Sequence, residues 1–362
     1  MSDYKALCKN FKIDGDVLSV EPYGEGHIND TYLVVTTETK YILQRVNNTV
    51  FKKPEEVIAN IAKVTAYMQK EIIKNGGDIL RETLTLVKTT DGKDFFIDDE
   101  GRLFRVYIFI DNATCYQIIE NGEIFYQAAR AFGQFQKTLQ NFPASELSET
   151  IPNFHNTVDR YRIFKEAIKA DKVDRLKIVE KEVEFALLRE KDAGIIVDAL
   201  ENKEIPLRVT HNDTKLNNVM IDDATKEGVC VIDLDTVMPG SMLYDFGDSI
   251  RFGASTAAED ELDLDKVNMD LALFEEYTKG YLEELGESIT EKEAELLPMS
   301  AKLMTLECGV RFLTDYLDGD NYFRIHRPDH NLDRARTQLK LVWDMEQKMD
   351  EMKKIVAKYY KK

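Results

Sequence analysis

The first third of the chain alternates apolar and polar positions with the two-residue period of β-strands. Its apolar runs are rich in β-branched and aromatic residues, and turn sequences such as Asp91-Gly92 separate some of them. The predicted strands cover residues 17–23, 31–36, 40–46, 84–87, 94–97 and 103–110, after a short helix over residues 4–12. This pattern predicts an antiparallel sheet in the N-terminal part of the chain.

One main helix is predicted within this strand-rich region, over residues 54–74. It begins with a proline followed by two acids, which favour the first turn of a helix. Its apolar positions Val57, Ile61, Val64 and Met68 recur at helical spacing. We therefore expect one face of this helix to pack on the sheet.

The pattern becomes helical after residue 122, apart from one predicted hairpin. Helical periodicity covers residues 124–139, 157–194 (as two helices), 258–285, 290–317 and 332–360, and the hairpin comprises residues 219–221 and 229–232. The expected fold class is α+β with two lobes. An N-terminal lobe over residues 1–110 holds the sheet and one main helix, and a larger, mostly α-helical lobe covers residues 111–362. Residues 111–114 are expected to link them.

Composition and charge exclude several kinds of function. A chain of 362 residues can bury a large core, and its formal net charge of -18 argues against binding to nucleic acid or to an anionic membrane. The N-terminus lacks the apolar core of a signal peptide, and no apolar run approaches the length of a membrane span. The four cysteines lie far apart, which argues against zinc or disulfides. We expect a cytoplasmic monomer or weak dimer.

Three polar residues at fixed spacing follow an apolar run: His211, Asp213 and Asn218. The apolar strand that comes next along the chain ends at Asp233. Phosphoryl transfer from a nucleotide needs an acid to orient the attacking hydroxyl and oxygen ligands for a metal ion on the phosphates. Asp213 is the candidate catalytic residue, and Asn218 and Asp233 are candidate ligands of Mg2+, which prefers oxygen. The alternative is an ordinary polar loop between strands.

A two-glycine turn, Gly24-Glu25-Gly26, lies between the first two predicted strands. Its backbone N–H groups could approach phosphate oxygens, although such turns also occur in hairpins without ligands. Arg45 ends the third strand, where the protein-kinase pattern has a phosphate-contacting lysine. Arginine would bind phosphate as a planar fork instead of a point charge. We expect Gly24, Gly26 and Arg45 to contact a nucleotide, and a surface arginine is the alternative for Arg45.

The last predicted strand of the sheet carries two further candidate nucleotide-binding residues, Tyr107 and Phe109. It runs into the link at residues 111–114, whose backbone would offer the adenine edge a donor and an acceptor. Glu55 and Glu56 are both candidates for pairing with Arg45, or they simply favour the N-terminus of their helix.

These motifs resemble those of the aminoglycoside phosphotransferase and choline kinase superfamily. The resemblance covers most of the chain and is carried by residues 209–218, 232–235 and 243–248. It implies a small-molecule kinase with a protein-kinase-like fold that uses ATP and Mg2+. Three further stretches resemble the N-acetylhexosamine 1-kinases of this superfamily: residues 24–32, 41–47 and 308–316. That closer resemblance implies transfer of phosphate to the anomeric hydroxyl of N-acetylglucosamine or N-acetylgalactosamine.

The same resemblance suggests which residues would hold the sugar. They are His27, Arg311 and Tyr322, together with Asp213. An uncharged sugar is positioned by a few convergent polar groups and flat apolar faces. Each residue has an alternative role. His27 could contact phosphate or close the turn, Arg311 could pair with Glu307 one helical turn earlier, and Tyr322 could pack in a loop.

Other polar residues near the motif are expected to act as structural supports. The resemblance suggests that Asp245 or Asp248, at the start of a probable helix, braces the loop, and that local hydrogen bonds hold His211. The helix dipole alone would also favour both acids. Asp235 lies close enough to Asp233 in sequence to assist the metal indirectly.

Three alternative functions remain. The first is a kinase of another small alcohol or sugar, such as choline or ethanolamine, although the aromatic cage that choline wants fits poorly with a single tryptophan, Trp343. The second is a catalytically weak, nucleotide-binding regulatory protein, against which the intact motif argues. The third is a protein kinase, but no Asp-Phe-Gly and Ala-Pro-Glu pair frames an activation loop. Asp245-Phe246-Gly247 matches Asp-Phe-Gly literally, yet Asp233 already occupies the metal-binding position.

Overall fold

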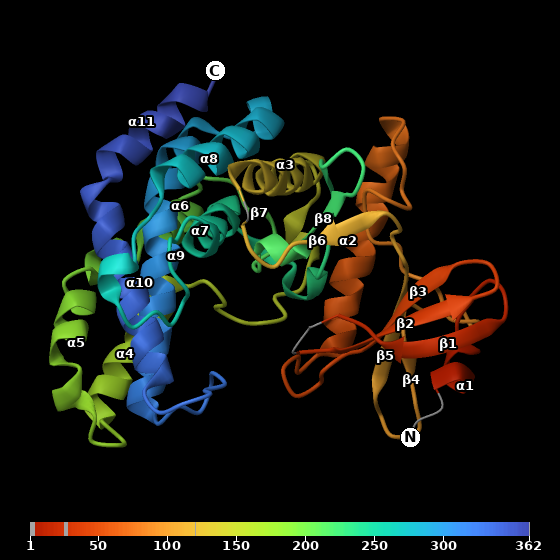
Figure 1. Ribbon diagram of the computed structural model, residues 1–362, viewed down its shortest axis with the longest axis horizontal. Helices are drawn as coiled ribbons and strands as arrows, with labels where there is room; N and C mark the ends of the chain where they lie inside the picture. The colour runs from red at the N-terminus through yellow and green to blue at the C-terminus, as the bar shows by residue number, and fades with distance from the viewer. Residues whose placement is uncertain (1–3, 25–27, 120, 362) are drawn as a thin grey trace.

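The computed structural model describes residues 4–24, 28–119 and 121–361. Its N-terminal part is a five-stranded sheet in which all paired neighbours are antiparallel, as the alternating pattern predicts (Figure 1). The strands follow the order β1-β2-β3-β5-β4 and comprise β1 (Val17–Pro22), β2 (Asp30–Thr36), β3 (Lys40–Arg45), β4 (Phe96–Ile97) and β5 (Leu103–Ile108).

Side chains alternate between the two faces of this sheet. On β5, Phe104 and Val106 pack with Leu7 of α1 (Tyr4–Cys8) in one apolar cluster. Leu103 and Tyr107 point the other way and share the larger core with α2 (Pro54–Lys74). The period of two residues therefore places Arg105 on the face that looks toward α2.

Helix α2 connects the sheet to the rest of the chain. The Asn60 side chain is 1% exposed, and its Nδ2 atom donates to the carbonyl oxygens of Ser148 (2.8 Å) and Val237 (2.9 Å). Both acceptors lie in the C-terminal part of the chain, so these hydrogen bonds hold α2 against that part.

The C-terminal part is mostly helical, as predicted. Helix α3 packs against α8, and α9 packs against α7 and α10. The helices are α3 (Gly122–Thr138), α4 (Thr157–Ala170), α5 (Glu180–Leu187), α6 (Ile195–Glu201), α7 (Met242–Gly253), α8 (Leu271–Leu285), α9 (Glu291–Asp318), α10 (His330–Gln347) and α11 (Met349–Tyr359). In one small sheet, β8 (Val219–Asp222) lies between β6 (Ala113–Cys115) and β9 (Gly228–Val231). In another, β7 (Arg208–Thr210) pairs with β10 (Met238–Gly240).

Some predicted elements differ from the structure. The stretch 84–87 forms no strand and makes only an isolated bridge between Leu86 and Tyr107. Residues 113–115, expected to be part of a plain link, form β6. Residues 258–270 precede α8 as loop and a short 3-10 turn, because acids such as Asp260 bond to distant partners, here His330, instead of continuing a helix. The division of the chain at residue 110 stays a prediction.

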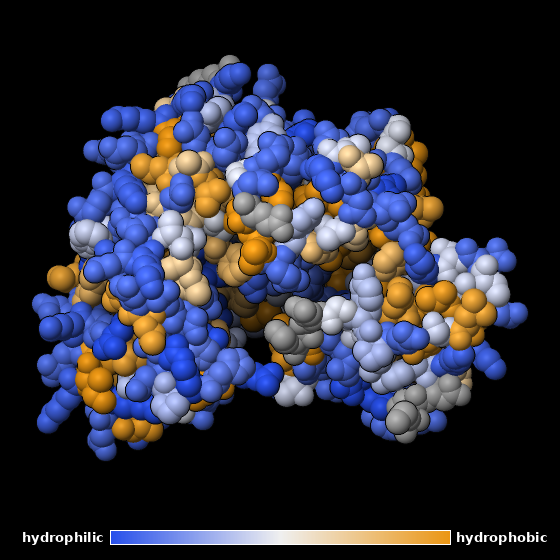
Figure 2. Space-filling model, viewed as in Figure 1, coloured by the Kyte–Doolittle hydropathy of each residue, from blue (hydrophilic) through white to orange (hydrophobic). Residues whose placement is uncertain are grey.

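Charged and polar residues cover most of the face in Figure 2, which shows a hollow between the sheet and the helical part. Within the described ranges, none of the helices combines the length and apolar character needed to cross a bilayer.

Candidate functional site

The motif loop, residues 211–218, is braced by one buried carboxylate. Asp245 is 1% exposed and stands in the first turn of α7. Its two oxygens accept hydrogen bonds from the backbone N–H groups of His211 (3.0 Å) and Asn212 (2.8 Å) and from Gln136 Nε2 (2.9 Å). Burial raises the pKa of Asp245, and these hydrogen bonds oppose the rise. Asp245 therefore fixes the backbone that carries the motif.

His211 is held in one orientation and tautomer. Its Nε2 atom lies 2.9 Å from the carbonyl oxygen of Ile232 and must donate to it. Its Nδ1 atom then accepts from the backbone N–H of Asp213 at 3.2 Å. The ring is fully buried against Phe132 and Phe135. The geometry thus places His211 as a support between the two halves of the site.

The carboxylate of Asp213 is held between two neighbours and remains open to solvent. Oδ1 lies 2.9 Å from Lys215 Nζ, and Oδ2 accepts from Asn218 Nδ2 at 3.2 Å. About a third of the side chain, 30%, is exposed. A carboxylate fixed in this way can accept a proton from a hydroxyl group that approaches from the open side.

Asn218 points its amide nitrogen back into the motif loop. Besides Asp213 Oδ2, that nitrogen donates to the Asp213 carbonyl oxygen at 2.8 Å. Both hydrogen bonds use Nδ2, and neither uses the Oδ1 atom of Asn218. An amide oxygen in this position is a suitable ligand for a hard cation.

Asp233 follows β9 in the left-handed conformation, with φ of 58°. Burial by the surrounding protein raises its pKa to about 6, and the nearby charges of Asp235 and Asp213 act in the same direction. The residue as a whole is nevertheless exposed to solvent, so the effect of burial is partly screened. The charges of Asp235 and Asp213 therefore act together on Asp233, and the charge of Arg105 only partly opposes them. An excess of negative charge of this kind favours binding of a divalent cation.

Asn218 and Asp233 could hold such a cation. The described part of the chain places no group of three or more His, Cys, Asp or Glu side chains where they could hold a metal ion. One carboxylate and one amide suit Mg2+, which usually takes few protein ligands and fills its shell with phosphate oxygens and water.

Lys215 connects this site to a second buried acid. Burial alone would lower the pKa of Lys215, but attraction to Asp213 and Asp248 raises it. Asp248 pairs with Arg251 at 2.8 Å, and the charges of Arg251, Lys215 and His155 hold its pKa low despite burial. The charges of Asp213 and Asp248 therefore both act on Lys215, and the role of Asp248 as a structural support of the motif loop stays a prediction.

The predicted phosphate-contacting residues of the N-terminal lobe are only partly described. Gly26 and His27 lie outside the described residues. Gly24 has φ of +78° and open space where a Cβ would stand. Arg45 pairs with Asp30 on the neighbouring strand at 2.5 Å, with 41% of its side chain exposed. Of the two acids on α2 considered as partners for Arg45, Glu56 pairs with Lys53 instead.

Tyr107 and Phe109 differ in their surroundings. Tyr107 is 4% exposed and packs in the core beneath the Arg105 guanidinium, 5.2 Å from the ring centroid. Phe109 lies at the end of the sheet, with Lys40 Nζ 5.2 Å from its ring. Their contact with a nucleotide stays a prediction.

Arg311 on α9 lies among aromatic rings. Its guanidinium carbon is 5.8 Å from the centroid of Phe154, 5.9 Å from Tyr322 and 5.5 Å from Phe323. Within the described ranges no hydrogen bond or ion pair of Arg311 is found.

Glu307, the alternative partner of Arg311, is hydrogen-bonded to two other residues, and the charges of His155 and Arg311 lower its pKa despite burial. Both Glu307 oxygens accept hydrogen bonds, from His155 Nδ1 (2.9 Å) and Thr157 Oγ1 (2.6 Å). The charge of His155 also helps to lower the pKa of Asp248. His155 and Glu307 therefore lie near Asp248, the acid whose charge acts on Lys215.

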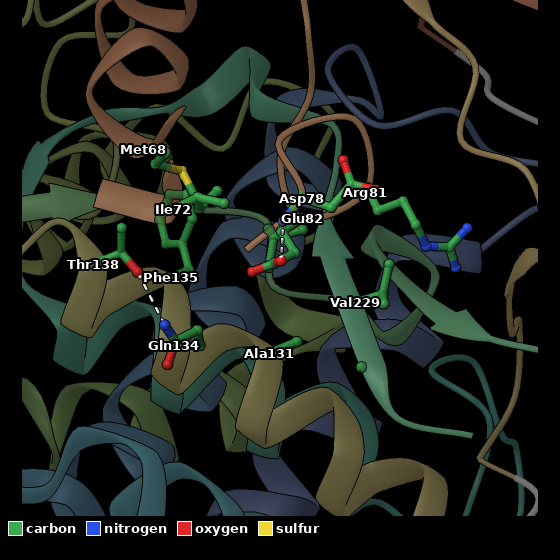
Figure 3. Close-up of a pocket in the computed structure, with 12 residues that line it drawn as sticks. Met68, Ile72, Asp78, Arg81, Glu82, Ala131, Gln134, Phe135, Thr138 and Val229 are labelled. Carbon is green, nitrogen blue, oxygen red and sulfur yellow. Dashed lines mark hydrogen bonds between the residues drawn. The ribbon is translucent and has the colours of Figure 1, made fainter. Parts of the chain in front are cut away.

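A pocket of about 300 Å³ lies away from the motif loop. It is lined by residues from the end of α2, residues 78–82, α3 and β9 (Figure 3). Asp213, Asn218 and Asp233 do not line it. Arg81 at its edge bonds to Asp222 and to the Asp111 carbonyl oxygen, both at 2.6 Å, so the pocket borders the link between the lobes.

Sequence reasoning missed two parts of the site. Lys215 stands two residues after Asp213, and its position inside the motif was the available signal. Arg105 pairs with Asp235 at 2.5 Å across the lobes. No local pattern marks Arg105, because its partner is far away in sequence.

Comparison with known proteins places this geometry in a family. A sequence model of the phosphotransferase enzyme family matches residues 19–281. Three solved structures are similar in fold. An aminopropanol kinase associated with a microcompartment is 14% identical (TM-score 0.58; 97% of this chain, 98% of that chain). A spectinomycin phosphotransferase, solved with ADP and spectinomycin, is 15% identical (0.56; 95% and 98%). A choline kinase from Cryptosporidium parvum Iowa II is 12% identical (0.58; 96% and 96%). The family match covers most of the chain and includes the whole motif loop, so the protein belongs to the phosphotransferase enzyme family.

Proposed function

We propose that the protein is an ATP-dependent kinase that transfers phosphate to the anomeric hydroxyl of an N-acetylhexosamine. The product would be the 1-phosphate of N-acetylglucosamine or N-acetylgalactosamine. The observation that carries the proposal is the carboxylate of Asp213, fixed between Lys215 and Asn218 and open on one side, with Asp233 close by.

In this proposal the nucleotide lies between the lobes, with its phosphates toward the motif loop. Mg2+ on Asn218 and Asp233, when bound, would neutralise charge on the phosphates. Asp213 orients the sugar hydroxyl and accepts its proton as the oxygen attacks the terminal phosphorus. Lys215 keeps the carboxylate in place, because its ammonium group lies 2.9 Å from Asp213 Oδ1.

The acceptor is proposed to lie beside Arg311. Its free guanidinium could donate to the carbonyl oxygen of an N-acetyl group, and the surrounding rings could pack on the apolar face of a sugar. His27 and Tyr322 are proposed to add contacts, and the Tyr322 ring is available because 71% of the residue is exposed.

Charge on this side argues against a cationic acceptor. Arg160 and Arg311 lie close enough that their repulsion, after the effect of burial, lowers the pKa of Arg160. Rings that could surround a choline ammonium already face the Arg311 cation. An amino alcohol, which carries a positive charge, would meet repulsion here.

A panel of acceptors tests the proposal. N-acetylglucosamine, N-acetylgalactosamine, their parent hexoses, choline and aminopropanol are compared at saturating ATP and Mg2+. We expect the N-acetylated sugars to give the highest kcat/KM. A clear preference for choline or aminopropanol would refute the assignment of the acceptor.

Arg311→Ala tests the acceptor site itself. Loss of a charged hydrogen bond should lower kcat/KM for the sugar by about ten- to a hundredfold and leave ATP affinity intact. Arg162→Ala is the control, because Arg162 lies on the exposed side of α4, where it pairs with Asp159 and Glu166. Unchanged sugar kinetics in a folded Arg311→Ala variant would contradict the placement.

A further inference from the structure

A buried ion pair joins the two lobes next to the candidate metal site. Arg105 on β5 is 1% exposed, and its Nη1 atom lies 2.5 Å from Oδ1 of Asp235, whose side chain is 5% exposed. The desolvation of two buried charges is seldom recovered fully by their attraction. A well-packed apolar pair could fill the same space, so the pair calls for an explanation other than stability alone.

The N-terminal lobe fixes the Arg105 side chain in one direction. Gln44 on the adjacent strand accepts from Nε at 3.0 Å and from Nη2 at 2.8 Å through its Oε1 atom. The guanidinium also lies over the Tyr107 ring. These contacts leave Nη1 directed at the C-terminal lobe.

Asp235 receives a second contact from the N-terminal lobe. Its Oδ2 atom accepts from Asn29 Nδ2 at 2.6 Å. Asn29 follows the two-glycine turn and precedes β2, and its Oδ1 atom accepts from the backbone N–H of Asn47 at 3.0 Å. The sheet and the segment after the turn therefore converge on one carboxylate.

The position of Asp235 bears directly on Asp233. Asp235 lies in the 3-10 turn η5 (Leu234–Thr236), and Asp233, in its left-handed conformation, is the residue before that turn. The backbone between the two acids is too short for one to shift independently of the other. The Arg105 charge also reaches Asp233 itself.

Arg45 does not make an equivalent contact. It pairs with Asp30 within its own sheet, and both side chains are more than two-fifths exposed. Exposed ion pairs of this kind contribute little to stability or orientation. The buried cation that the sheet directs at the metal-site acids is Arg105.

We propose that Arg105 is a positioning residue that, through Asp235, sets where Asp233 stands relative to the nucleotide-binding lobe. Asn29, which precedes β2, also binds the Asp235 carboxylate and so links a second segment of the N-terminal lobe to it. This inference rests on the proposed nucleotide- and Mg2+-dependent function. It predicts that Arg105 changes how nucleotide affinity depends on Mg2+, although the Arg105 side chain is not expected to contact the metal ion or the nucleotide.

The test compares Arg105→Met, Asp235→Leu and the double variant. A single substitution leaves one buried charge unpaired and should destabilise the fold. The double variant restores an apolar pair and should recover most of this stability, less the cost of leaving Gln44 Oε1 and Asn29 Nδ2 without these partners. Affinity for a non-hydrolysable ATP analogue is measured by fluorescence titration, once in EDTA and once across a range of Mg2+ concentrations. The double variant should fold, bind the analogue in EDTA as the wild type does, and need about ten- to a hundredfold more Mg2+.

A matched control breaks a buried ion pair that lies within the C-terminal lobe alone. Lys302 Nζ lies 2.7 Å from Asp192 and 2.8 Å from Glu346. Lys302→Met should lose stability and keep the wild-type Mg2+ dependence. A stable double variant with wild-type Mg2+ dependence would overturn the positioning role and leave the proposed function intact. A wild-type protein that binds no nucleotide would instead overturn the proposed function, and this inference with it.

Discussion

Replacement of Asp233 by asparagine should stabilise the metal-free protein while abolishing its activity. Asparagine fits the site sterically and tolerates the left-handed conformation, with φ of 58° at this residue, so the substitution removes charge without straining the backbone. An alanine substitution would remove the charge and also strain the left-handed backbone, so the two effects could not be separated.

The magnitude follows from the raised pKa of Asp233. Its pKa rises from 3.8 to about 6, and a rise of this size corresponds to about 3 kcal/mol before screening. The carboxylate opens partly to solvent, which we expect to reduce the effect to about 1 kcal/mol. Because the folded state binds this proton more tightly than the unfolded chain does, ionisation of Asp233 lowers stability. This loss of stability is complete above about pH 6. It disappears near pH 4, as Asp233 becomes protonated in both the folded and the unfolded state.

Urea unfolding in EDTA measures this difference at pH 7 and at successively lower pH. Asp233→Asn should unfold at a higher urea concentration than the wild type at pH 7, and the two curves should converge toward pH 4. Mg2+ with an ATP analogue should stabilise the wild type and not the variant. An Asp233→Asn variant that is less stable than the wild type at pH 7, or a gap that widens as the pH falls, would refute the electrostatic account.

Three further predictions concern the motif loop. Asp213→Asn should lower kcat by about a hundred- to ten-thousandfold with nucleotide affinity retained, so a variant with nearly wild-type turnover would contradict the role of Asp213. Asn218→Ala should raise the Mg2+ concentration needed for half-maximal activity, by less than the loss of Asp233 does; an unchanged requirement would place the metal elsewhere. Asp245→Asn should lower the free energy of unfolding by about 2–3 kcal/mol in urea, because the backbone N–H of His211 or Asn212 loses its acceptor; an unchanged midpoint would contradict the brace.

The elements that the sequence predicts well are those whose signals are local. Helix α2 begins and ends where predicted, at residues 54 and 74, because a proline at its start and a regular apolar face define it without help from the rest of the chain. The hairpin of β8 and β9 also forms as expected, since both strands are short apolar runs joined by a polar turn.

The elements that the sequence misses depend on distant partners. Strand β6 pairs with β8, more than a hundred residues further along the chain, so its three residues carry no strand signal of their own. Residues 84–87 have strand composition, yet their neighbour in the sheet offers them only a bridge at Leu86. The Arg105 contact with Asp235 likewise depends on how the lobes meet.

The central claim is that this site transfers phosphate to the anomeric oxygen of an N-acetylhexosamine. Phosphorus NMR of the product formed from N-acetylglucosamine, ATP and Mg2+ tests it most directly, with Asp213→Asn as the matched control. We predict a single new phosphomonoester signal that is coupled to the anomeric proton and absent from the control. A phosphate on any other hydroxyl, or only free phosphate from ATP, would contradict the claim.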